Sequence, residues 1–233
     1  MKYITTATYN VCHGHYAELK WSRLAEVIRN SKADIVGMQE IDIRTNRIGG
    51  QDMLRCLTQE TGLAHSLFVP AMDFDGGQYG TAILSRYPLS KTCVIPLPSS
   101  GYEPRSFGCV TVQPPESAPI AFLNTHLSYE SQKQQTLQAE EIRKWMEENL
   151  SPAVPALLTA DFNTDDLTVL SPVLEEGFIP VNTPNAPFLT FRPDAIAIDN
   201  ILYRGSVLTP EAMGMIDSDY SDHNLLWCRF AMR

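Results

Sequence analysis

The stretch Pro155-Ala156-Leu157-Leu158-Thr159-Ala160-Asp161-Phe162-Asn163 is the most informative segment of this chain. Its apolar part has the length of a buried strand, and it stops abruptly at an Asp and an Asn. Because residues two apart in an extended chain point to the same side, the Asp161 carboxylate and the Asn163 amide project together from the strand tip. This pair is suited to presenting oxygen and nitrogen atoms to a phosphate, a metal ion or a water.

The same design recurs along the chain. Polar, chemically active residues stand at or near the ends of further apolar segments: Asn10, Gln39-Glu40, Asn124 with His126, Asp199-Asn200 and Asp222-His223. A turn explains any one such ending, because Asp and Asn are common in turns. Strands packed side by side bring their ends together, however, so the recurrence predicts one shared pocket in an enzyme.

Composition limits the classes of protein. The 233 residues, 44% of them hydrophobic, suffice for one domain over residues 1–233 with a full core. A net charge of -9 disfavours non-specific nucleic-acid binding, which Lys and Arg drive. Five scattered cysteines without a CxxC pair argue against a disulfide framework and structural zinc, and favour reduced thiols. No stretch approaches the ~20 apolar residues of a membrane span, and residues 1–10 resemble a strand rather than a signal peptide, so we expect a cytoplasmic protein.

Periodicity predicts a mixture of strands and helices. Helices are expected near residues 17–31, 51–61, 130–149 and 166–176, the third with Leu137, Ile142 and Trp145 on its buried side. Strands are expected near 3–9, 34–38, 65–69, 79–85, 91–95, 105–112, 120–123, 155–163 and 199–203, with a last one after His223. The elements do not alternate strictly, and no GxGxxG or P-loop sequence is present. The pattern therefore favours an α/β fold of the α+β or mixed-sheet type over a doubly wound one.

The residue types limit the chemistry. Carboxylate and amide oxygens suit a hard cation such as Mg²⁺ or Mn²⁺, whereas zinc would want more His or Cys. Two histidines and several aspartates can carry protons and donate to phosphate. No GxSxG elbow or Cys-His nucleophile is evident, so phosphate-ester hydrolysis fits better than acyl transfer.

The motifs, taken in order, resemble those of the endonuclease/exonuclease/phosphatase superfamily, whose fold is that of deoxyribonuclease I. The resemblance runs from residue 8 to residue 223 through Thr8-Tyr9-Asn10, Gln39-Glu40, Tyr79–Arg86, Asn124-Thr125-His126-Leu127, Ala160–Asn163, Ile198–Ile201 and Ser221-Asp222-His223. Each motif is weak alone, and the ordered set is specific. The resemblance implies a four-layered α/β sandwich, with two packed mixed β-sheets flanked by helices and a divalent-metal site at one edge.

The resemblance also implies roles for the carboxylates and amides. Glu40 resembles the main metal-binding carboxylate, with Asn10 as its partner and Asp222 as a further metal ligand or an orienting group. Asp161 resembles the residue that orients or deprotonates the attacking water. Asn163 would contact the phosphate or a second metal position.

The histidines receive phosphate-binding roles by the same resemblance. His223 would stabilise the pentacovalent transition state. His126 would contact the phosphate or help protonate the leaving group, with Asp199 pairing with it and orienting it. At this motif the abasic-site repair nucleases carry a tyrosine, so His126 resembles the deoxyribonuclease I, sphingomyelinase and inositol phosphatase branches instead.

Four further residues are candidates for substrate binding. Arg44 and Arg105 are suited to bidentate phosphate contacts, although solvated surface arginines are common. Asn124 belongs to the His126 motif. His13 follows Asn10 and would line the pocket mouth, with an exposed loop histidine as the alternative.

The sequence thus predicts a Mg²⁺- or Mn²⁺-dependent hydrolase of a small or lipid-derived phosphate ester, acting by in-line attack of water. A sequence-tolerant endonuclease or exonuclease remains an alternative, so nucleic acid is a possible but not favoured partner. An inactive binding module on the same scaffold is the other alternative, against which the complete acid, amide and histidine set argues. The sequence leaves the oligomeric state open.

Overall fold

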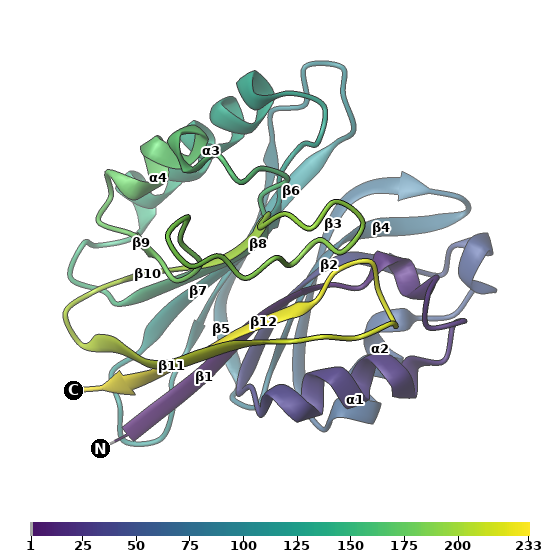
Figure 1. The fold of residues 1–233 in the computed structure, drawn as a ribbon, viewed down its shortest axis with the longest axis horizontal. Helices are drawn as coiled ribbons and strands as arrows, with labels where there is room; N and C mark the ends of the chain where they lie inside the picture. The colour runs from purple at the N-terminus through teal and green to yellow at the C-terminus, as the bar shows by residue number, and fades with distance from the viewer. Residues whose placement is uncertain (1) are drawn as a thin grey trace.

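Two six-stranded mixed sheets pack face to face in the computed structural model, which describes residues 2–233 (Figure 1). The first sheet has the strand order β11-β12-β1-β2-β4-β3, in which β1 and β2 are parallel. Its strands are β1 (Lys2–Asn10), β2 (Ile35–Ile43), β3 (His65–Phe74), β4 (Gly77–Ser85), β11 (Leu208–Ile216) and β12 (Leu225–Met232).

The second sheet has the order β5-β6-β7-β8-β10-β9, in which β7 and β8 are parallel. Its strands are β5 (Leu89–Leu97), β6 (Arg105–Val112), β7 (Ile120–His126), β8 (Ala156–Asp161), β9 (Ile179–Pro180) and β10 (Asp199–Arg204). The stretch Ala156–Asp161 is buried throughout, as its unbroken apolar sequence predicts for a central strand covered on both faces.

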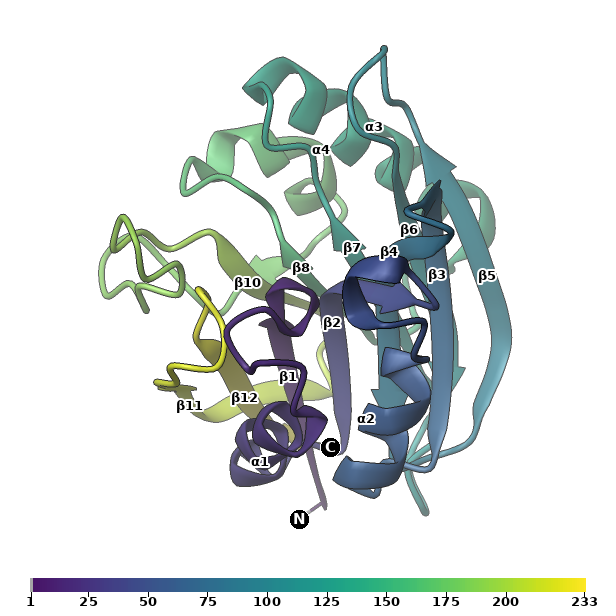
Figure 2. The same cartoon turned by 90° about the vertical axis from the view of Figure 1, so that its right-hand side faces the viewer.

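Helices cover the outer face of each sheet (Figures 1 and 2). Helices α1 (Trp21–Ser31) and α2 (Met53–Thr61) lie on the first sheet, and α3 (Gln132–Asn149) and α4 (Ser171–Leu174) on the second. Three apolar clusters fill the spaces: one under α1 and α2, one under α3 and α4, and one between the sheets that includes Ile35, Phe122 and Phe230. The predicted four-layered α/β sandwich is confirmed.

Several predicted boundaries were wrong. Helix α1 begins at Trp21 because residues 12–19 form a 3-10 turn and further turns, with five residues at positive φ. The segment 166–176 divides into a 3-10 turn (Leu167–Leu170) and the short α4. On α3, Ile142 is buried, but Leu137 is 36% exposed, because only a narrow face of this polar helix meets the sheet. The edge strand β11, with its half-exposed pattern, was not predicted.

Strand β2 does not end before Gln39-Glu40 as predicted but continues to Ile43 through a β-bulge. The pairing with β4 shifts between Met38 and Ile41, and Glu40 has φ +60°. An extra residue in one strand turns side chains to a new direction, and bulges are common beside functional sites. Here the bulge directs Glu40 toward the cavity described below.

A buried hydrogen-bond network connects the two sheets below that cavity. The Asn124 amide nitrogen donates to the carbonyls of Met38 and Ala82, both at 3.0 Å. Its Oδ1 accepts from Gln39 Nε2 at 2.8 Å and from Thr159 Oγ1 at 3.0 Å. Because every polar atom of this buried amide is paired, the network fixes the position of one sheet relative to the other.

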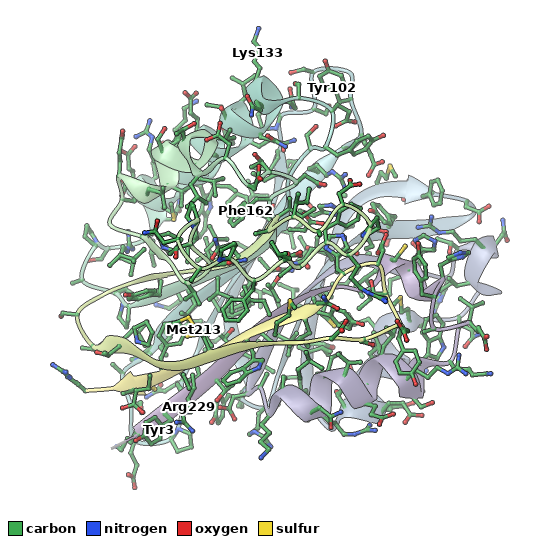
Figure 3. All side chains as sticks on the ribbon, viewed as in Figure 1. Tyr3, Tyr102, Lys133, Phe162, Met213 and Arg229 are labelled. Atoms are coloured by element: carbon green, nitrogen blue, oxygen red, sulfur yellow. The ribbon has the colours of Figure 1, made fainter. Side chains whose placement is uncertain are left out.

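The burial of the side chains follows the pattern of apolar and polar residues in the sequence. Phe162, which follows the last residue of β8, lies in the interior, whereas Lys133 on α3 and Tyr102 point outward (Figure 3). Within residues 2–233, no helix combines the length and apolar character that a membrane crossing needs.

Candidate active site

The polar strand ends meet at one edge of the sandwich. Strands β1, β2, β7 and β8 all run toward this edge, and β10 starts there because it is antiparallel to β8. In the second sheet, His126 and Asp199 are both direct register partners of Asp161, one on each side. The topology therefore gathers residues from distant parts of the sequence into one place.

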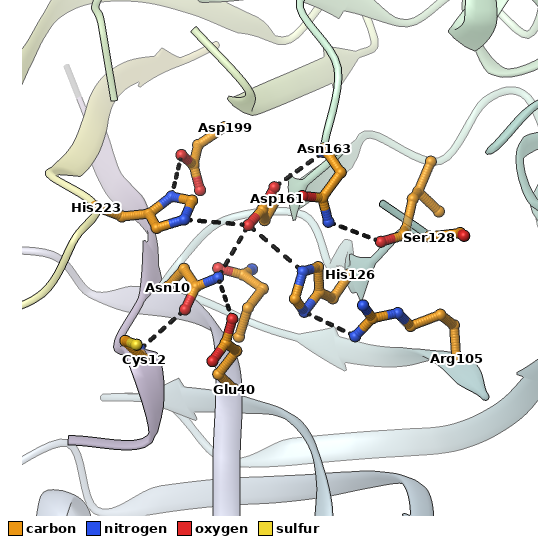
Figure 4. A network of polar contacts seen from close by, with 12 residues as sticks. Asn10, Cys12, Glu40, Arg105, His126, Ser128, Asp161, Asn163, Asp199 and His223 are labelled. Carbon is orange, nitrogen blue, oxygen red and sulfur yellow. Dashed lines mark hydrogen bonds and ion pairs between the residues drawn. The ribbon is translucent and has the colours of Figure 1, made fainter. Parts of the chain in front are cut away.

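Asp161 is the centre of the resulting network (Figure 4). Its Oδ2 accepts a hydrogen bond from Asn10 Nδ2 at 2.9 Å and lies 3.4 Å from His126 Nε2 and 3.5 Å from His223 Nε2. Its Oδ1 accepts from the backbone N–H of Asn163 at 2.9 Å. Burial, and next the charge of Asp199, raise the pKa of Asp161 above that of an ordinary aspartate.

His223 is held as an imidazolium. Its Nδ1 lies 2.8 Å from Asp199 Oδ2, and both side chains are almost fully buried. Burial would lower the pKa of His223, but the carboxylates of Asp199 and Asp161 outweigh it and raise the pKa to about 10. The ring of Phe191 packs against the imidazole, with 5.0 Å between the centroids. The predicted pairing of Asp199 with His126 is wrong: Asp199 orients His223, because β10 delivers it on the other side of Asp161.

His126 has the opposite electrostatic environment. Its Nδ1 lies 3.2 Å from Nη1 of Arg105, which also pairs with Glu103 at 2.9 Å. Because a guanidinium only donates, Nδ1 must accept, and the ring proton is on Nε2, which faces Asp161. Burial, followed by the positive charge of Arg105, lowers the pKa of His126 well below its usual value. His126 is therefore a neutral hydrogen-bond donor.

Glu40 presents an ionised carboxylate to the cavity. Its Oε1 accepts from Asn10 Nδ2 at 3.1 Å, and its Oε2 lies 3.3 Å from His13 Nδ1. Burial opposes ionisation, yet the hydrogen bonds with His13 and Asn10 help to lower its pKa to about 2. In residues 2–233, no Lys or Arg forms an ion pair with Glu40. A carboxylate with spare acceptor positions and no fixed cationic partner fits a hard metal ion.

The neighbours of Glu40 narrow the choice of metal. Ligand atoms of Cys12, His13 and Glu40 lie within 4.8 Å of one another, and Asp222 lines the same cavity. Burial raises the pKa of the Cys12 thiol, and the charge of Glu40 raises it further, which disfavours the thiolate form that binds metals. The His13 imidazole and the carboxylates of Glu40 and Asp222 then remain as donors, and the carboxylate oxygens suit Mg²⁺ or Mn²⁺.

The side-chain amide of Asn163 has one hydrogen bond within residues 2–233. Its Nδ2 donates to the carbonyl of Leu127 at 2.9 Å, and its backbone adopts φ +55°. This bond uses one of the two N–H groups of the amide, so the other N–H can donate to a phosphate oxygen and Oδ1 can accept from a donor or bind a cation.

These residues surround a cavity of about 310 Å³. Its remaining walls are charged and aromatic: Arg47, Met72, Phe74, Tyr79, Glu103, Arg105, Tyr129 and Phe191. Of the predicted site residues, Asn10, Asp199, Arg44 and Asn124 do not line it. Asn10 and Asp199 contact the lining residues from behind, Asn10 through Glu40 and Asp161, and Asp199 through His223. Arg44 is exposed on the loop after β2, and Asn124 is buried in the network between the sheets.

Arg47 is the main residue that the sequence analysis overlooked. It stands three positions after Arg44 and enters the cavity, because the loop after β2 turns back at Asn46–Ile48. The sequence feature that could have indicated Arg47 is Asp42. This carboxylate interrupts a β-forming run, and a buried carboxylate needs a cationic partner.

The geometry fits a hydrolytic centre for phosphate esters: an acceptor carboxylate, two flanking imidazoles and an adjacent ionised carboxylate that could hold a hard cation. The family model of the Endonuclease/Exonuclease/phosphatase family matches residues 7–223, and the chain belongs to this family. Its members are hydrolases that act on phosphate esters and commonly use divalent metals. No curated protein matches the chain.

Solved structures share the fold at low sequence identity. An endonuclease/exonuclease/phosphatase from Beutenbergia cavernae has a TM-score of 0.83 and 22% identity, with 100% of this chain and 72% of that chain covered. The human Nocturnin catalytic domain, solved with a sulfate anion, has a TM-score of 0.75 and 18% identity, with coverage of 99% and 94%. A mannosyl-6-phosphatase from Bacteroides thetaiotaomicron has a TM-score of 0.71 and 17% identity, with coverage of 98% and 100%.

Proposed function

We propose that this protein is a Mg²⁺-dependent hydrolase of a small or lipid-derived phosphate ester, in which water attacks phosphorus in line with the leaving group. The observation that carries the proposal is the contact set of Asp161 Oδ2, which has Asn10, His126 and His223 within 3.5 Å. A carboxylate that is surrounded by donors and open to a cavity can hold a water and the phosphate that the water attacks.

Asp161 is the proposed base. The pKa of Asp161 is raised and so lies nearer to neutral pH, and a general base is most effective when its pKa is near the working pH. The Asn10 amide and the Asn163 backbone N–H fix the carboxylate plane, so the attacking water would be positioned before reaction.

The two imidazoles would donate to the phosphate from either side of Asp161. His223 carries a positive charge that Asp199 sustains, so it can neutralise negative charge on a non-bridging oxygen and can also give up a proton. His126 donates through Nε2–H only, because Arg105 holds it neutral. From the sequence, His126 was expected to contact the phosphate or to help protonate the leaving group; here His126 keeps the first role and His223 is the proposed proton donor.

Glu40 and Asp222 would hold the metal, with Asn163 Oδ1 as a further oxygen donor. Asn10 would position the Glu40 carboxylate through Nδ2, since its Oδ1 accepts from the backbone N–H of Cys12 at 3.0 Å. When bound, the ion supplies Lewis-acid stabilisation of the developing negative charge.

The cavity favours a compact substrate. A volume of about 310 Å³ holds a phosphate and a modest leaving group, and the chain's net charge of -9 provides little attraction for a long polyanion. Five free cysteines fit the reducing cytoplasm that we infer as its location.

A substrate panel tests the proposal. The purified protein would be assayed with Mg²⁺ or Mn²⁺ on bis-p-nitrophenyl phosphate, p-nitrophenyl phosphate, sphingomyelin, DNA and RNA. We expect EDTA-sensitive turnover of a small or lipid phosphate ester. Turnover of nucleic acid alone would indicate a nuclease and refute the proposal. Absence of any metal-dependent turnover or thermal shift would favour an inactive binding module.

A further inference from the structure

Arg47 is an anchored arginine at the outer wall of the cavity. Its Nε donates to Asp42 Oδ2 at 2.6 Å and its Nη2 to Asp42 Oδ1 at 2.8 Å. Asp42 is fully buried, and Thr45 Oγ1 completes its contacts at 2.6 Å. A bidentate, charge-assisted pair of this kind fixes the orientation of the guanidinium plane.

The loop that carries Arg47 is anchored as well. The backbone N–H of Arg47 donates to Asp75 Oδ2 at 2.7 Å, and Asn46 Nδ2 donates to Asp75 Oδ1 at 3.2 Å. The guanidinium carbon lies 4.6 Å from the centre of the Phe74 ring and 5.5 Å from that of Tyr79. Backbone, charge and ring contacts together hold this side chain in one place, although it remains 30% exposed.

One edge of this fixed guanidinium is free. Across residues 2–233, Nη1 of Arg47 has no hydrogen-bond partner, while Nε and Nη2 are used by Asp42. The residue lines the same cavity as Asp161 and the two histidines. A permanently charged group at a cavity wall, with both N–H donors of Nη1 unused, is suited to an anionic oxygen.

Arg47 and Arg105 stand on two sides of Tyr79. The Tyr79 hydroxyl lies 3.5 Å from Arg105 Nη1, and its ring faces Arg47. Arg105 contacts His126 and so belongs to the reaction centre. The Arg47 side chain is 30% exposed and that of Arg105 only 3%, so Arg47 lies nearer the mouth of the cavity, where it can meet another part of the same ligand.

We propose that Arg47 forms a second anion subsite, which binds a carboxylate or a second phosphate on the substrate beyond the phosphate that is cleaved. Phe74, Tyr79 and Met72 would contact the carbon skeleton between the two anionic groups. This inference rests on the proposed function, since it assigns the other end of that substrate.

A matched ligand series tests the subsite: propyl phosphate, propanediol monophosphate, propanediol bisphosphate and phosphooxypropanoate, with longer homologues of each. They would be measured as inhibitors of bis-p-nitrophenyl phosphate hydrolysis with excess Mg²⁺. Their affinities would also be measured by calorimetry in an Asp161→Asn background, where turnover is blocked. A wild-type protein that hydrolyses no phosphate ester would refute the proposed function, while calorimetry would still decide the role of Arg47.

We expect the bisphosphate and the carboxylate, at the best chain length, to bind about tenfold or more tightly than propyl phosphate. Arg47→Met should abolish this preference and leave propyl phosphate unchanged. Arg55→Met, which removes one exposed positive charge on α2, is the control and should keep the preference. If bisphosphate exceeds carboxylate, the second group is a phosphate; the reverse order indicates a carboxylate.

Three results would overturn the subsite: no preference in the wild type, equal binding of the neutral propanediol monophosphate, or an equal loss for every ligand in Arg47→Met. Since that variant leaves the buried Asp42 unpaired, Asp42→Asn/Arg47→Met provides a second variant without a buried charge. It should show the same selective loss, with its fold checked by circular dichroism.

Discussion

His126 and His223 lie at nearly equal distances from Asp161, 3.4 Å and 3.5 Å, and yet they differ in charge. His223 has a carboxylate behind it, so its pKa rises to about 10. His126 has a guanidinium behind it, so its pKa falls well below the usual value. The residue on the far side of each ring, rather than the ring itself, decides its role.

Because of this difference in charge, the two histidines have different roles in the site. A charged donor on the β10 side can stabilise negative charge and release a proton, whereas a neutral donor on the β7 side can only position an oxygen. Four predictions can break or sharpen this comparison.

The largest effect is expected at the residue that both histidines share. Asp161→Asn preserves shape but removes the proton acceptor, so turnover should fall on the order of 10³–10⁴-fold. Steady-state assays with Mg²⁺ measure it, with thermal unfolding as the check on folding. Near wild-type turnover would remove Asp161 from the role of base.

Next come the histidines themselves. His223→Gln should reduce turnover about 10³-fold and His126→Gln about 10²-fold, because a charge-assisted donor stabilises the transition state more than a neutral one. The ratio of the two losses under identical conditions is the measurement. Equal losses, or a larger loss at His126, would contradict the roles assigned to the two histidines.

A smaller effect is expected for Asp199 and Arg105, the residues that contact Nδ1 of each histidine. Asp199→Asn should lower the pKa of His223 and reduce turnover about tenfold at neutral pH. Activity requires protonated His223, so the alkaline decline in the pH–rate profile should move from near 10 toward the ordinary histidine value. Arg105→Met, on the other ring, should leave that alkaline decline in place.

The smallest effect concerns stability without metal. The pKa of His223 is about 10 in the folded chain and about 6.5 in an unfolded one, so the native state binds this proton more tightly. The resulting stabilisation is fully present below pH about 6.5 and is lost as pH rises through about 10. Denaturant unfolding in EDTA should show the difference between wild type and His223→Gln shrinking over this range. A difference independent of pH would mean that His223 is not charged in the folded state.

The fold was predictable because its strands are recorded in the sequence as apolar runs with polar ends. Ala156–Asp161 is buried throughout, and Asp161 and Asn163 both line the cavity, although Asn163 lies beyond the end of β8 with φ +55° and not in an alternating strand. The gathering of the six strand ends followed from packing strands side by side. Their identities matched a known family order, which supplied the two-sheet architecture.

The errors share a physical cause. The sequence does not say which side of Asp161 each neighbour occupies, so Asp199 was paired with the wrong histidine. It does not show a bulge, so the strand was expected to end at residue 38, and Arg47 was not among the predicted site residues. Asn124 stands in a motif rich in catalytic residues, but a polar side chain in a fully buried strand can also bond to its own protein.

The Asn124 amide has a mechanical consequence. Strands β1 and β2 carry Asn10 and Glu40, while β7 and β8 carry His126 and Asp161, so the two walls of the cavity belong to different sheets. With Asn124 bonded to Met38, Ala82, Gln39 and Thr159, the sheets resist sliding past each other. Amide protons of β2 and β7 should therefore be among the slowest to exchange with deuterium. Ligand entry would then depend on the surrounding loops, and the reacting groups would stay aligned between successive turnovers.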